Sequence, residues 1–284
     1  CGPNADHVLL KVDHLGEEII AKRLPGIRES GKIFAGVDAV NEPLPVFPTA
    51  HYVMGGIPTD PYGRVIVPQG TGEEVVPGLY AAGECACVSV HGANRLGGNS
   101  LLDILVFGRA AGLDVIENLK ENKNHRPMNE TSVEKAMARL TRWDQAGEGI
   151  SVRELRDEFR KTMEDHAGVF RTEEIMAEGV EKLKALRDKL PDVRLGDHSK
   201  VFNTARVEAL ELENLFDTGI AIAYSALMRK ESRGAHSRPD HPDRDDANWM
   251  KHSLYFKEDD RMDYKPVQTK PLTVETFPPK ERVY

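Results

Sequence analysis

The sequence predicts a mixed α and β fold, because its stretches differ sharply in pattern. Short apolar runs between glycine-rich turns fill residues 47–119, as is typical of buried strands. Apolar residues at helical spacing dominate residues 130–228, and residues 229–284 are charged and rich in proline. We therefore expect strands and turns, then packed helices, then a small terminal module.

The first 46 residues predict one strand and one short helix. Val8, Leu10 and Val12 recur at every second position, the period of a strand. Residues 17–24 fit a short helix that Pro25 would stop, because proline interrupts the helical hydrogen-bond ladder.

Two buried strands and a helix are expected in residues 47–119. The strands are Val65–Val67 and Leu79–Ala82. The helix follows Gly97 and Gly98, with Asn99 or Ser100 as its N-cap. Two further glycines inside this helix are expected to allow close packing against a sheet: Gly108 and Gly112.

Residues 130–228 predict an antiparallel helical bundle. Thr131 with Glu134, and Ser151 with Glu154, both fit the capping box that opens a helix. Pro191 would close one helix, and a long helix would follow it from 202 to 228. The apolar stripes are Leu155, Phe159, Thr162 and Met163 in one helix, and Ile175, Gly179, Leu183 and Leu186 in the next.

Charge and composition exclude some classes of function. The formal net charge of −8 argues against nucleic-acid binding, which needs clustered positive charge. No apolar run approaches the roughly 20 residues needed to cross a bilayer. The chain starts at Cys1 rather than at methionine, so we expect a fragment or a processed product.

The three cysteines are Cys1, Cys85 and Cys87, an odd number that suggests a reducing compartment. The pair at 85 and 87 could bind a metal, but no second pair completes such a site. We expect buried structural thiols and no metal.

An acidic residue follows the second predicted strand. Glu84 comes after Gly83, at the carboxyl end of a strand, where α/β sheets bind ligands. A carboxylate there can accept hydrogen bonds from a ribityl or ribose group. The alternative is a strand that ends in a capping glutamate.

A single arginine lies in the glycine-rich loop before the helix. Arg95 is well placed to grip a carboxylate with two hydrogen bonds, and the helix N-terminus beside it favours an anion. The alternative is an arginine that satisfies carbonyl groups of its own loop.

His51 precedes the pair Gly55 and Gly56, which would allow backbone to approach a ligand closely. The alternative is an ordinary hydrogen-bonded loop histidine, and the pattern alone favours it.

These motifs together resemble the succinate dehydrogenase and fumarate reductase flavoprotein family, and within it the succinate dehydrogenase branch. The resemblance runs essentially from end to end. The stretches that carry it are residues 48–59, 76–84, 86–103, 231–238 and 242–249.

The resemblance implies roles for individual residues. His51 and Arg95 would bind a dicarboxylate and act in catalysis, helped by backbone at Gly98. Glu84 would bind the ribityl chain of FAD. The residues against the flavin ring would be Asn99, Ser100 and Leu101. The family's pyrophosphate-binding loop, flavin-linking histidine and proton-transferring arginine would lie upstream of Cys1.

The resemblance also implies four domains and a hinge. Residues 1–46 would be the tail of a capping domain, and residues 47–126 the C-terminal part of an FAD-binding α/β domain. Residues 127–246 would form the helical bundle, and 247–284 a small C-terminal α+β domain. A hinge is expected near residues 45–48, and the charge cluster from Arg233 to Asp246 is interpreted as structural.

The implied reaction is oxidation of succinate to fumarate by hydride transfer to FAD, with electrons passed to an iron–sulfur subunit and then to quinone. Membrane-anchor subunits would hold the assembly at the cytoplasmic face of a bacterial inner membrane, or at the matrix side in mitochondria. This chain alone is expected to be incomplete and inactive. The alternatives are a fumarate reductase, an L-aspartate oxidase, and a helical scaffold without activity.

Overall fold

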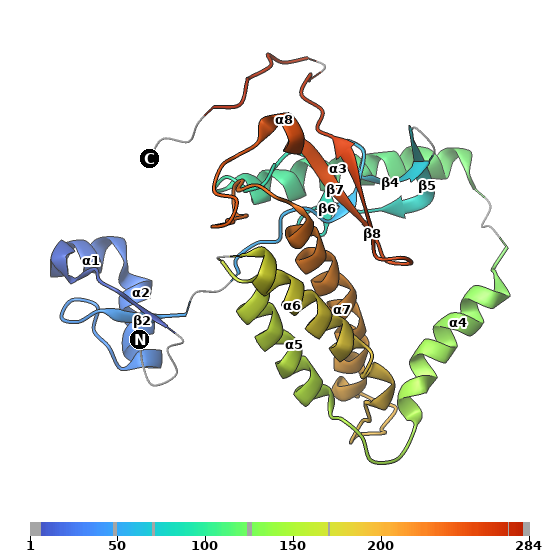
Figure 1. Cartoon of the computed structure of the whole chain (residues 1–284), viewed down its shortest axis with the longest axis horizontal. Helices are drawn as coiled ribbons and strands as arrows, with labels where there is room; N and C mark the ends of the chain where they lie inside the picture. Colours follow the sequence, from blue (N-terminus) through green and yellow to red (C-terminus); the bar gives the residue numbers. More distant parts are fainter. Residues whose placement is uncertain are drawn as a thin grey trace. The chain divides into compact units, whose positions relative to one another are not determined.

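The computed structural model describes residues 7–47, 50–69, 72–123, 127–169, 171–271 and 273–280. By their contacts the residues form two units, one ending at Val53 and the other beginning at Met54 (Figure 1). Mixed α and β structure is confirmed. The predicted domain bounds at 46, 126 and 246 stay predictions, as does the hinge, since Pro48 lies outside the described residues.

The first unit is a two-stranded sheet with two short helices. β1 (Val8–Leu10) pairs antiparallel with β2 (Leu44–Val46), and α1 (Glu17–Arg23) and α2 (Pro25–Ser30) lie between them in sequence. The predicted strand and helix are confirmed. Pro25 also begins α2, because a missing N–H costs nothing in the first turn of a helix. Short helical turns span Asp13–Leu15 and Gly31–Ala35.

A small core and an ion pair hold this unit together. Ile20, Ala39 and Leu44 are buried against one another. Arg28 donates to both oxygens of Asp38, at 2.8 and 3.0 Å, and joins α2 to the loop before β2.

Four strands open the second unit. β3 (Ile57–Pro58) pairs in parallel with β6 (Ala86–Cys87), and β4 (Arg64–Gln69) pairs antiparallel with β5 (Gly72–Tyr80). The two buried strands were predicted only in part. Val65 and Ile66 are buried, but Val67 is 42% exposed, Leu79 is 51% exposed and β5 ends at Tyr80. The reason is that β4 and β5 form a two-stranded ribbon that is buried only near the start of β4, whereas residues 67–69 and their partners 72–74 are exposed.

Helix α3 (Asn99–Glu121) packs beside these strands. Two glycines outside the helix allow the close approach. A Cβ added at Gly63 would lie 2.9 Å from the Cβ of Ala111, and a Cβ added at Gly83 would lie 2.9 Å from the side chain of Ile104. The prediction for Gly108 and Gly112 is wrong, since a Cβ at either would meet no described atom within 4 Å. The glycines that allow close packing therefore lie beside the strands and not in the helix.

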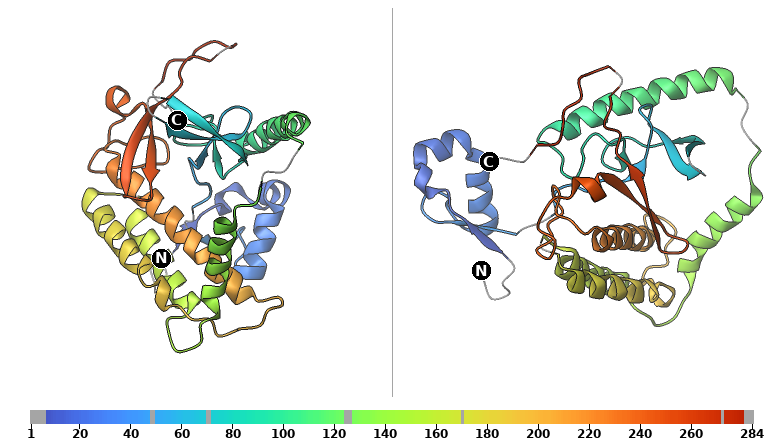
Figure 2. Two further views of the ribbon diagram at one scale, coloured as in Figure 1. Left: turned by 90° about the vertical axis from the view of Figure 1, so that its right-hand side faces the viewer. Right: turned by 45° about the horizontal axis from the view of Figure 1, so that its top comes forward.

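Residues 130–228 form α4 (Glu130–Thr141), α5 (Val152–Ala167), α6 (Glu173–Arg187) and α7 (Thr204–Met228). Figure 1 and Figure 2 show α5, α6 and α7 side by side. Lys189 donates to Glu158 at 3.3 Å and Lys182 lies 3.2 Å from His166, so α5 and α6 run antiparallel. The predicted helical bundle is confirmed for these three helices.

The helix ends test the capping predictions. Ser151 and Glu154 form a capping box at α5, as predicted. The prediction for Thr131 is wrong: Asn129 caps α4 by accepting from the amide of Ser132, and Thr131 lies inside the helix. Asparagine is as good an N-cap as threonine, and Asn129 lies two residues earlier, so the helix begins there. After α6, Pro191 lies in the short turn Leu190–Asp192, and another such turn, Arg142–Asp144, follows α4.

The main core lies between α5, α6 and α7. Leu155, Phe159 and Leu183 are buried as predicted, and the rings of Phe159 and Phe216 meet edge to face at 4.9 Å between centroids. Ile175 is 39% exposed instead of buried, because Met176 takes the inward position on α6.

The C-terminal part consists of α8 (Asp246–Trp249) and a hairpin of β7 (Lys251–Phe256) and β8 (Arg261–Pro266). His252 on β7 lies 3.1 Å from the hydroxyl of Ser89, and Lys265 on β8 pairs with Glu73 on β5 at 2.5 Å. The hairpin therefore contacts the strand region as well as the helices. Among the residues described, no helix has both the length and the apolar character to span a membrane.

Candidate functional site

The segment Ser89–Gly98, called here the Arg95 loop, leads directly into α3. Gly98 adopts a left-handed conformation (φ 80°) at the N-cap position, and the helix begins at Asn99. The predicted cap at Asn99 or Ser100 is therefore wrong, since both lie in the first turn. Gly98 supplies no side chain at this end, which leaves the positive end of the helix dipole accessible to an anion.

Arg95 is half-buried in this loop. Its Nη1 donates to the carbonyl of Leu96 at 3.1 Å, the kind of local contact that the alternative interpretation expected. The guanidinium carries five donors in a planar fork, a geometry that suits a carboxylate. The role of Arg95 stays a prediction.

A histidine–aspartate pair closes the base of the Arg95 loop. His91 Nε2 and Asp103 Oδ2 are 2.8 Å apart, and Asp103 is 5% exposed on α3. A cavity of about 170 Å³ adjoins the pair, and its lining includes Asn99, Leu102 and Phe107. The sequence alone did not predict this pair, although the stretch that contains it carries the family resemblance. The signal that could have found it is Asp103 itself, an acidic residue between apolar residues in the first turns of the helix.

Glu84 lies in the turn between β5 and β6, and its side chain is exposed. The preceding Gly83 (φ 81°) packs against Ile104 of α3, so the turn with Glu84 is held against the same helix that the Arg95 loop enters. Tyr80, at the end of β5, donates to Asp114 of α3 at 2.7 Å. Burial, together with the neighbouring Asp114, raises the pKa of this phenol.

His51 belongs to the first unit, in a stretch without regular secondary structure, and is exposed. One member of the glycine pair that suggested a ligand, Gly56, has a structural explanation. A Cβ at Gly56 would lie 2.5 Å from the carbonyl oxygen of Cys85, so Gly56 lets β3 approach β6. The predicted role of His51 therefore rests on the family resemblance alone.

The cysteines differ from the expectation of buried thiols. Cys85 is exposed and Cys87 is half-buried in β6, while Cys1 lies outside the described residues. One cluster of possible metal ligands among the described residues is Glu173, Asp240 and His241. Asp240 in that cluster is paired with Arg238 at 2.7 Å, which lowers the pKa of the carboxyl group.

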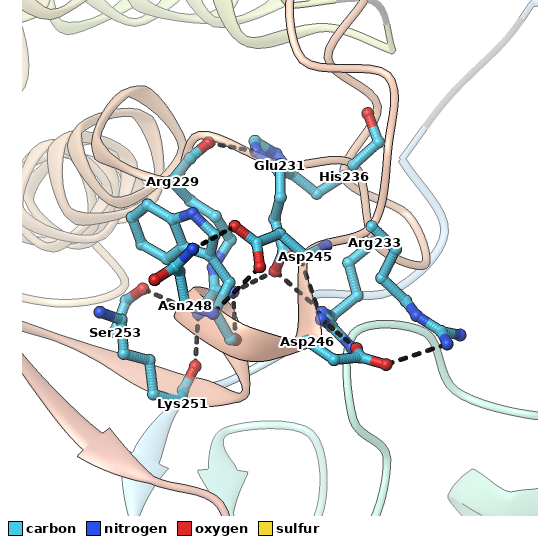
Figure 3. Close-up of polar contacts among 12 residues, drawn as sticks. Arg229, Glu231, Arg233, His236, Asp245, Asp246, Asn248, Lys251 and Ser253 are labelled. Atoms are coloured by element: carbon cyan, nitrogen blue, oxygen red, sulfur yellow. Dashed lines mark hydrogen bonds and ion pairs between the residues drawn. The ribbon is translucent and has the colours of Figure 1, made fainter. Parts of the chain in front are cut away.

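The predicted charge cluster from Arg233 to Asp246 contains one fully buried charge, Arg238, and a second one, Glu231, lies just before it. Glu231 has no exposed surface and accepts from Arg229 at 2.5 Å and from Arg233 at 2.8 and 2.9 Å (Figure 3). Arg238 is also fully buried and donates to Asp240 through two nitrogens, each at 2.7 Å. Such buried charges persist only when they are paired. The observed pairing agrees with the structural interpretation of this cluster.

Comparison with known proteins places these features in a family. A model described as fumarate reductase flavoprotein C-term matches residues 156–284, and an FAD binding domain model matches residues 2–101. The chain is 52% identical over 282 residues to the succinate dehydrogenase flavoprotein subunit of Coxiella burnetii. It is 46% identical over 288 residues to the mitochondrial succinate dehydrogenase flavoprotein subunit of Oryza sativa.

A solved structure of the Escherichia coli quinol fumarate reductase aligns with all of this chain, with a TM-score of 0.84 and 41% identity. The chain covers 47% of that structure's chain, 48% of the C. burnetii protein and 46% of the O. sativa protein. It therefore spans about half the length of the relatives that it matches.

Proposed function

The chain belongs to the succinate dehydrogenase and fumarate reductase flavoprotein family, and we propose that it forms the C-terminal half of a succinate dehydrogenase flavoprotein. The observation that carries the proposal is the Arg95 loop, in which an arginine shortly precedes the uncapped N-terminus of α3. The proposed reaction is the oxidation of succinate to fumarate.

FAD is the cofactor that this family implies, and the described residues fit it. Gly98 leaves the start of α3 free of a capping side chain, Leu101 is 65% exposed and Glu84 is exposed in the adjoining turn. We assign Glu84 to the ribityl chain, and the first turn of α3 to the isoalloxazine ring: Asn99, Ser100 and Leu101. When bound, FAD supplies the hydride acceptor.

Arg95 is proposed to bind one carboxylate of succinate through two hydrogen bonds, with the backbone of Gly98 beside it. His51 is proposed as a second substrate ligand. An unactivated C–H bond next to a carboxylate is a poor acid, so the protein must fix the position of the dianion before reaction. A guanidinium suits this task because its donors are planar and permanently charged.

The relatives' assemblies suggest the proposed partners. The E. coli relative is a quinol fumarate reductase, and another solved relative is an Sdh1 complex of Mycobacterium smegmatis with UQ1. We propose that electrons leave to an iron–sulfur subunit and then to quinone, and that membrane-anchor subunits hold the assembly at the membrane. The proposed side of the membrane is the bacterial cytoplasmic face or the mitochondrial matrix face.

The test is an Arg95→Lys variant of the full-length flavoprotein that contains this sequence. We expect kcat/KM for succinate to fall by about 100-fold or more, because an ammonium group cannot reproduce the two-pronged contact. The control is Arg153→Lys, which changes an arginine with an 83% exposed side chain on α5. Near-normal kcat/KM in Arg95→Lys would remove Arg95 from the substrate site.

Fumarate reduction is the second candidate, because the E. coli relative carries that name at 41% identity over the whole chain. Rates of succinate oxidation and fumarate reduction, measured on the same preparation, distinguish the two. A full-length protein without either activity would favour the helical scaffold.

A further inference from the structure

The Arg95 loop is tied to the C-terminal part of the chain at two points. Ser89 Oγ lies 3.1 Å from His252 Nε2 on β7. The amide of Ala235 donates to the carbonyl of Ala93 at 3.0 Å. Since Ala93 is two residues before Arg95, the second contact acts on the backbone that carries the guanidinium.

The contact at Ala93 requires glycine at position 234. Gly234 has φ +59°, a left-handed conformation that other residues rarely adopt. A Cβ there would lie 2.5 Å from the carbonyl carbon of Ala93 and 2.9 Å from its Cβ. The two backbones therefore meet with no space for a side chain.

The turn that makes this contact is fixed at both of its ends. Arg233 and His236 exchange backbone hydrogen bonds of 2.9 and 3.0 Å across Gly234 and Ala235. Arg233 is held by two bonds to the fully buried Glu231, and by Asp246 at 2.7 Å (Figure 3).

His236 anchors the other end of the turn. Its Nδ1 lies 3.2 Å from Nη1 of Arg171, and its Nε2 lies 3.1 Å from the carbonyl oxygen of Arg229. Because a guanidinium only donates, Nδ1 accepts and Nε2 carries the proton that is donated to the carbonyl. Because the turn is held at both ends, its hydrogen bond from Ala235 fixes the position of the Ala93 carbonyl.

We propose that the Arg233–His236 turn positions Arg95, with Gly234 and Ala235 fixing the Ala93 carbonyl from outside while the His91–Asp103 pair fixes the base of the loop. The consequence for dicarboxylate binding rests on the proposed function. Gly234 and Glu231 are then positioning residues that act on the substrate through Arg95.

The first test follows the loop itself, by hydrogen–deuterium exchange of the full-length flavoprotein that contains this sequence. In Gly234→Ala the added methyl must displace Ala93, so we expect amide exchange in residues 92–97 to speed up by about tenfold or more. Gly78→Ala is the matched control, because Gly78 also has a positive φ (+81°) but a Cβ there meets nothing within 4 Å. Equal loop exchange in the two variants would overturn the proposal.

Ser89→Ala is a gentler second variant, which removes only the hydroxyl that meets His252. It tests the other contact that ties the loop to the C-terminal part of the chain. Faster exchange in residues 89–93 supports the contact with β7, and unchanged exchange contradicts it. If Gly234→Ala fails to fold, Asp246→Ala, which removes one partner of Arg233, tests the turn, and unchanged exchange in residues 92–97 would contradict the proposal.

The second test measures ligand binding in the full-length flavoprotein. Gly234→Ala is expected to raise the Kd of malonate, a non-reacting dicarboxylate, and the KM of succinate by about tenfold, with kcat changed less than about threefold. The flavin absorbance spectrum should be unchanged, which a general loss of structure would not allow. Unchanged Kd and KM would show that the turn does not position Arg95.

The outcomes separate the two proposals. If the wild-type flavoprotein binds no dicarboxylate and yet loop exchange responds to Gly234→Ala, the proposed function fails while the turn still fixes the loop. If dicarboxylates bind but neither exchange nor Kd responds, the positioning role fails and the proposed function stands.

Discussion

His236 lies between two hydrogen-bond partners that fix its tautomer. Burial is the main reason why the pKa of this histidine falls from 6.5 to about 4, and the nearby Arg171 adds to the effect by repelling a second positive charge. In the unfolded chain the same imidazole titrates near its ordinary value. Between these two pKa values the unfolded state binds more protons than the folded state.

The free energy of unfolding should therefore fall as the pH drops from about 6.5 to about 4, and be flat with respect to this group above 6.5. We expect a loss on the order of 2 kcal/mol by pH 4.5, allowing for the partial exposure of the ring. Urea unfolding of the 284-residue chain at pH 7.5, 6.5, 5.5 and 4.5 measures it.

The control is His236→Gln, which removes the titrating group. The difference between wild type and this variant isolates His236 from other groups, including His252, whose pKa is also lowered by burial. Parallel pH profiles for the two proteins would contradict the assignment.

Single residues could be predicted where their signal is local. The capping box of Ser151 follows from neighbours in sequence, and the structure confirms it. The burial of Glu231 and Arg238 could not be predicted, since the charged, proline-rich stretch resembles a solvated loop and the burial comes from pairing in three dimensions. The place of Gly234 against Ala93 depends on a contact between residues 141 positions apart and has no local signature.

At the scale of elements, the caps of α4 and α5 give a direct comparison. Ser151→Ala removes the hydroxyl that accepts from the amide of Glu154, and Asn129→Ala removes the acceptor for Ser132. We expect each helix N-terminus to lose about 1 kcal/mol of stability. Thr131→Ala is the matched control, since Thr131 is exposed inside α4 and should cost less than about 0.5 kcal/mol.

The three variants are compared by urea unfolding, with amide exchange used to assign the loss to α4 or to α5. A loss in Thr131→Ala as large as that in Asn129→Ala would restore Thr131 as the cap.

The existence and type of the long helices followed from apolar periodicity, but strand pairing did not. The periodicity of residues 202–228 predicted α7 to within a few residues. The parallel pairing of β3 with β6 joins two very short strands separated by a ribbon, and neither has a pattern of its own. The prediction for Gly108 and Gly112 was wrong because close packing at a glycine depends on which element lies opposite it in the fold, and the sequence around the glycine does not give that element.

At the scale of the whole molecule, α3 carries an unusual surface. Only Asp103 is buried on this helix, whereas eight of its large apolar side chains are 46–68% exposed. They are Leu101, Leu102, Ile104, Leu105, Val106, Leu113, Ile116 and Leu119. A helix that is apolar on most sides is normally buried, and apolar patches of this kind mark interaction surfaces.

We therefore expect the 284-residue chain by itself to bind the dye ANS and to self-associate. Leu105→Glu, which alters a 68% exposed residue on α3, should lower ANS fluorescence by about half or more by breaking the patch. The matched control is Val169→Glu, at a 65% exposed valine after α5, which should change little. Equal ANS fluorescence in both variants would place the dye elsewhere.

The general architecture was predictable because the four stretches differ in composition and period, and the mixed fold and the bundle are confirmed. The relation of His51 to Arg95 was inferred from family resemblance, and it stays a prediction.

The Glu231 carboxylate has a consequence for how such a sequence can diverge. It accepts hydrogen bonds from Arg229, Arg233 and the amide of Asp245, so replacing the glutamate or either arginine leaves a buried charge with fewer partners. A substitution at one of these positions would lower the stability of the fold unless another position changed with it. Related sequences should thus keep the glutamate and both arginines together or replace all three together, and few natural variants should have only one of them replaced.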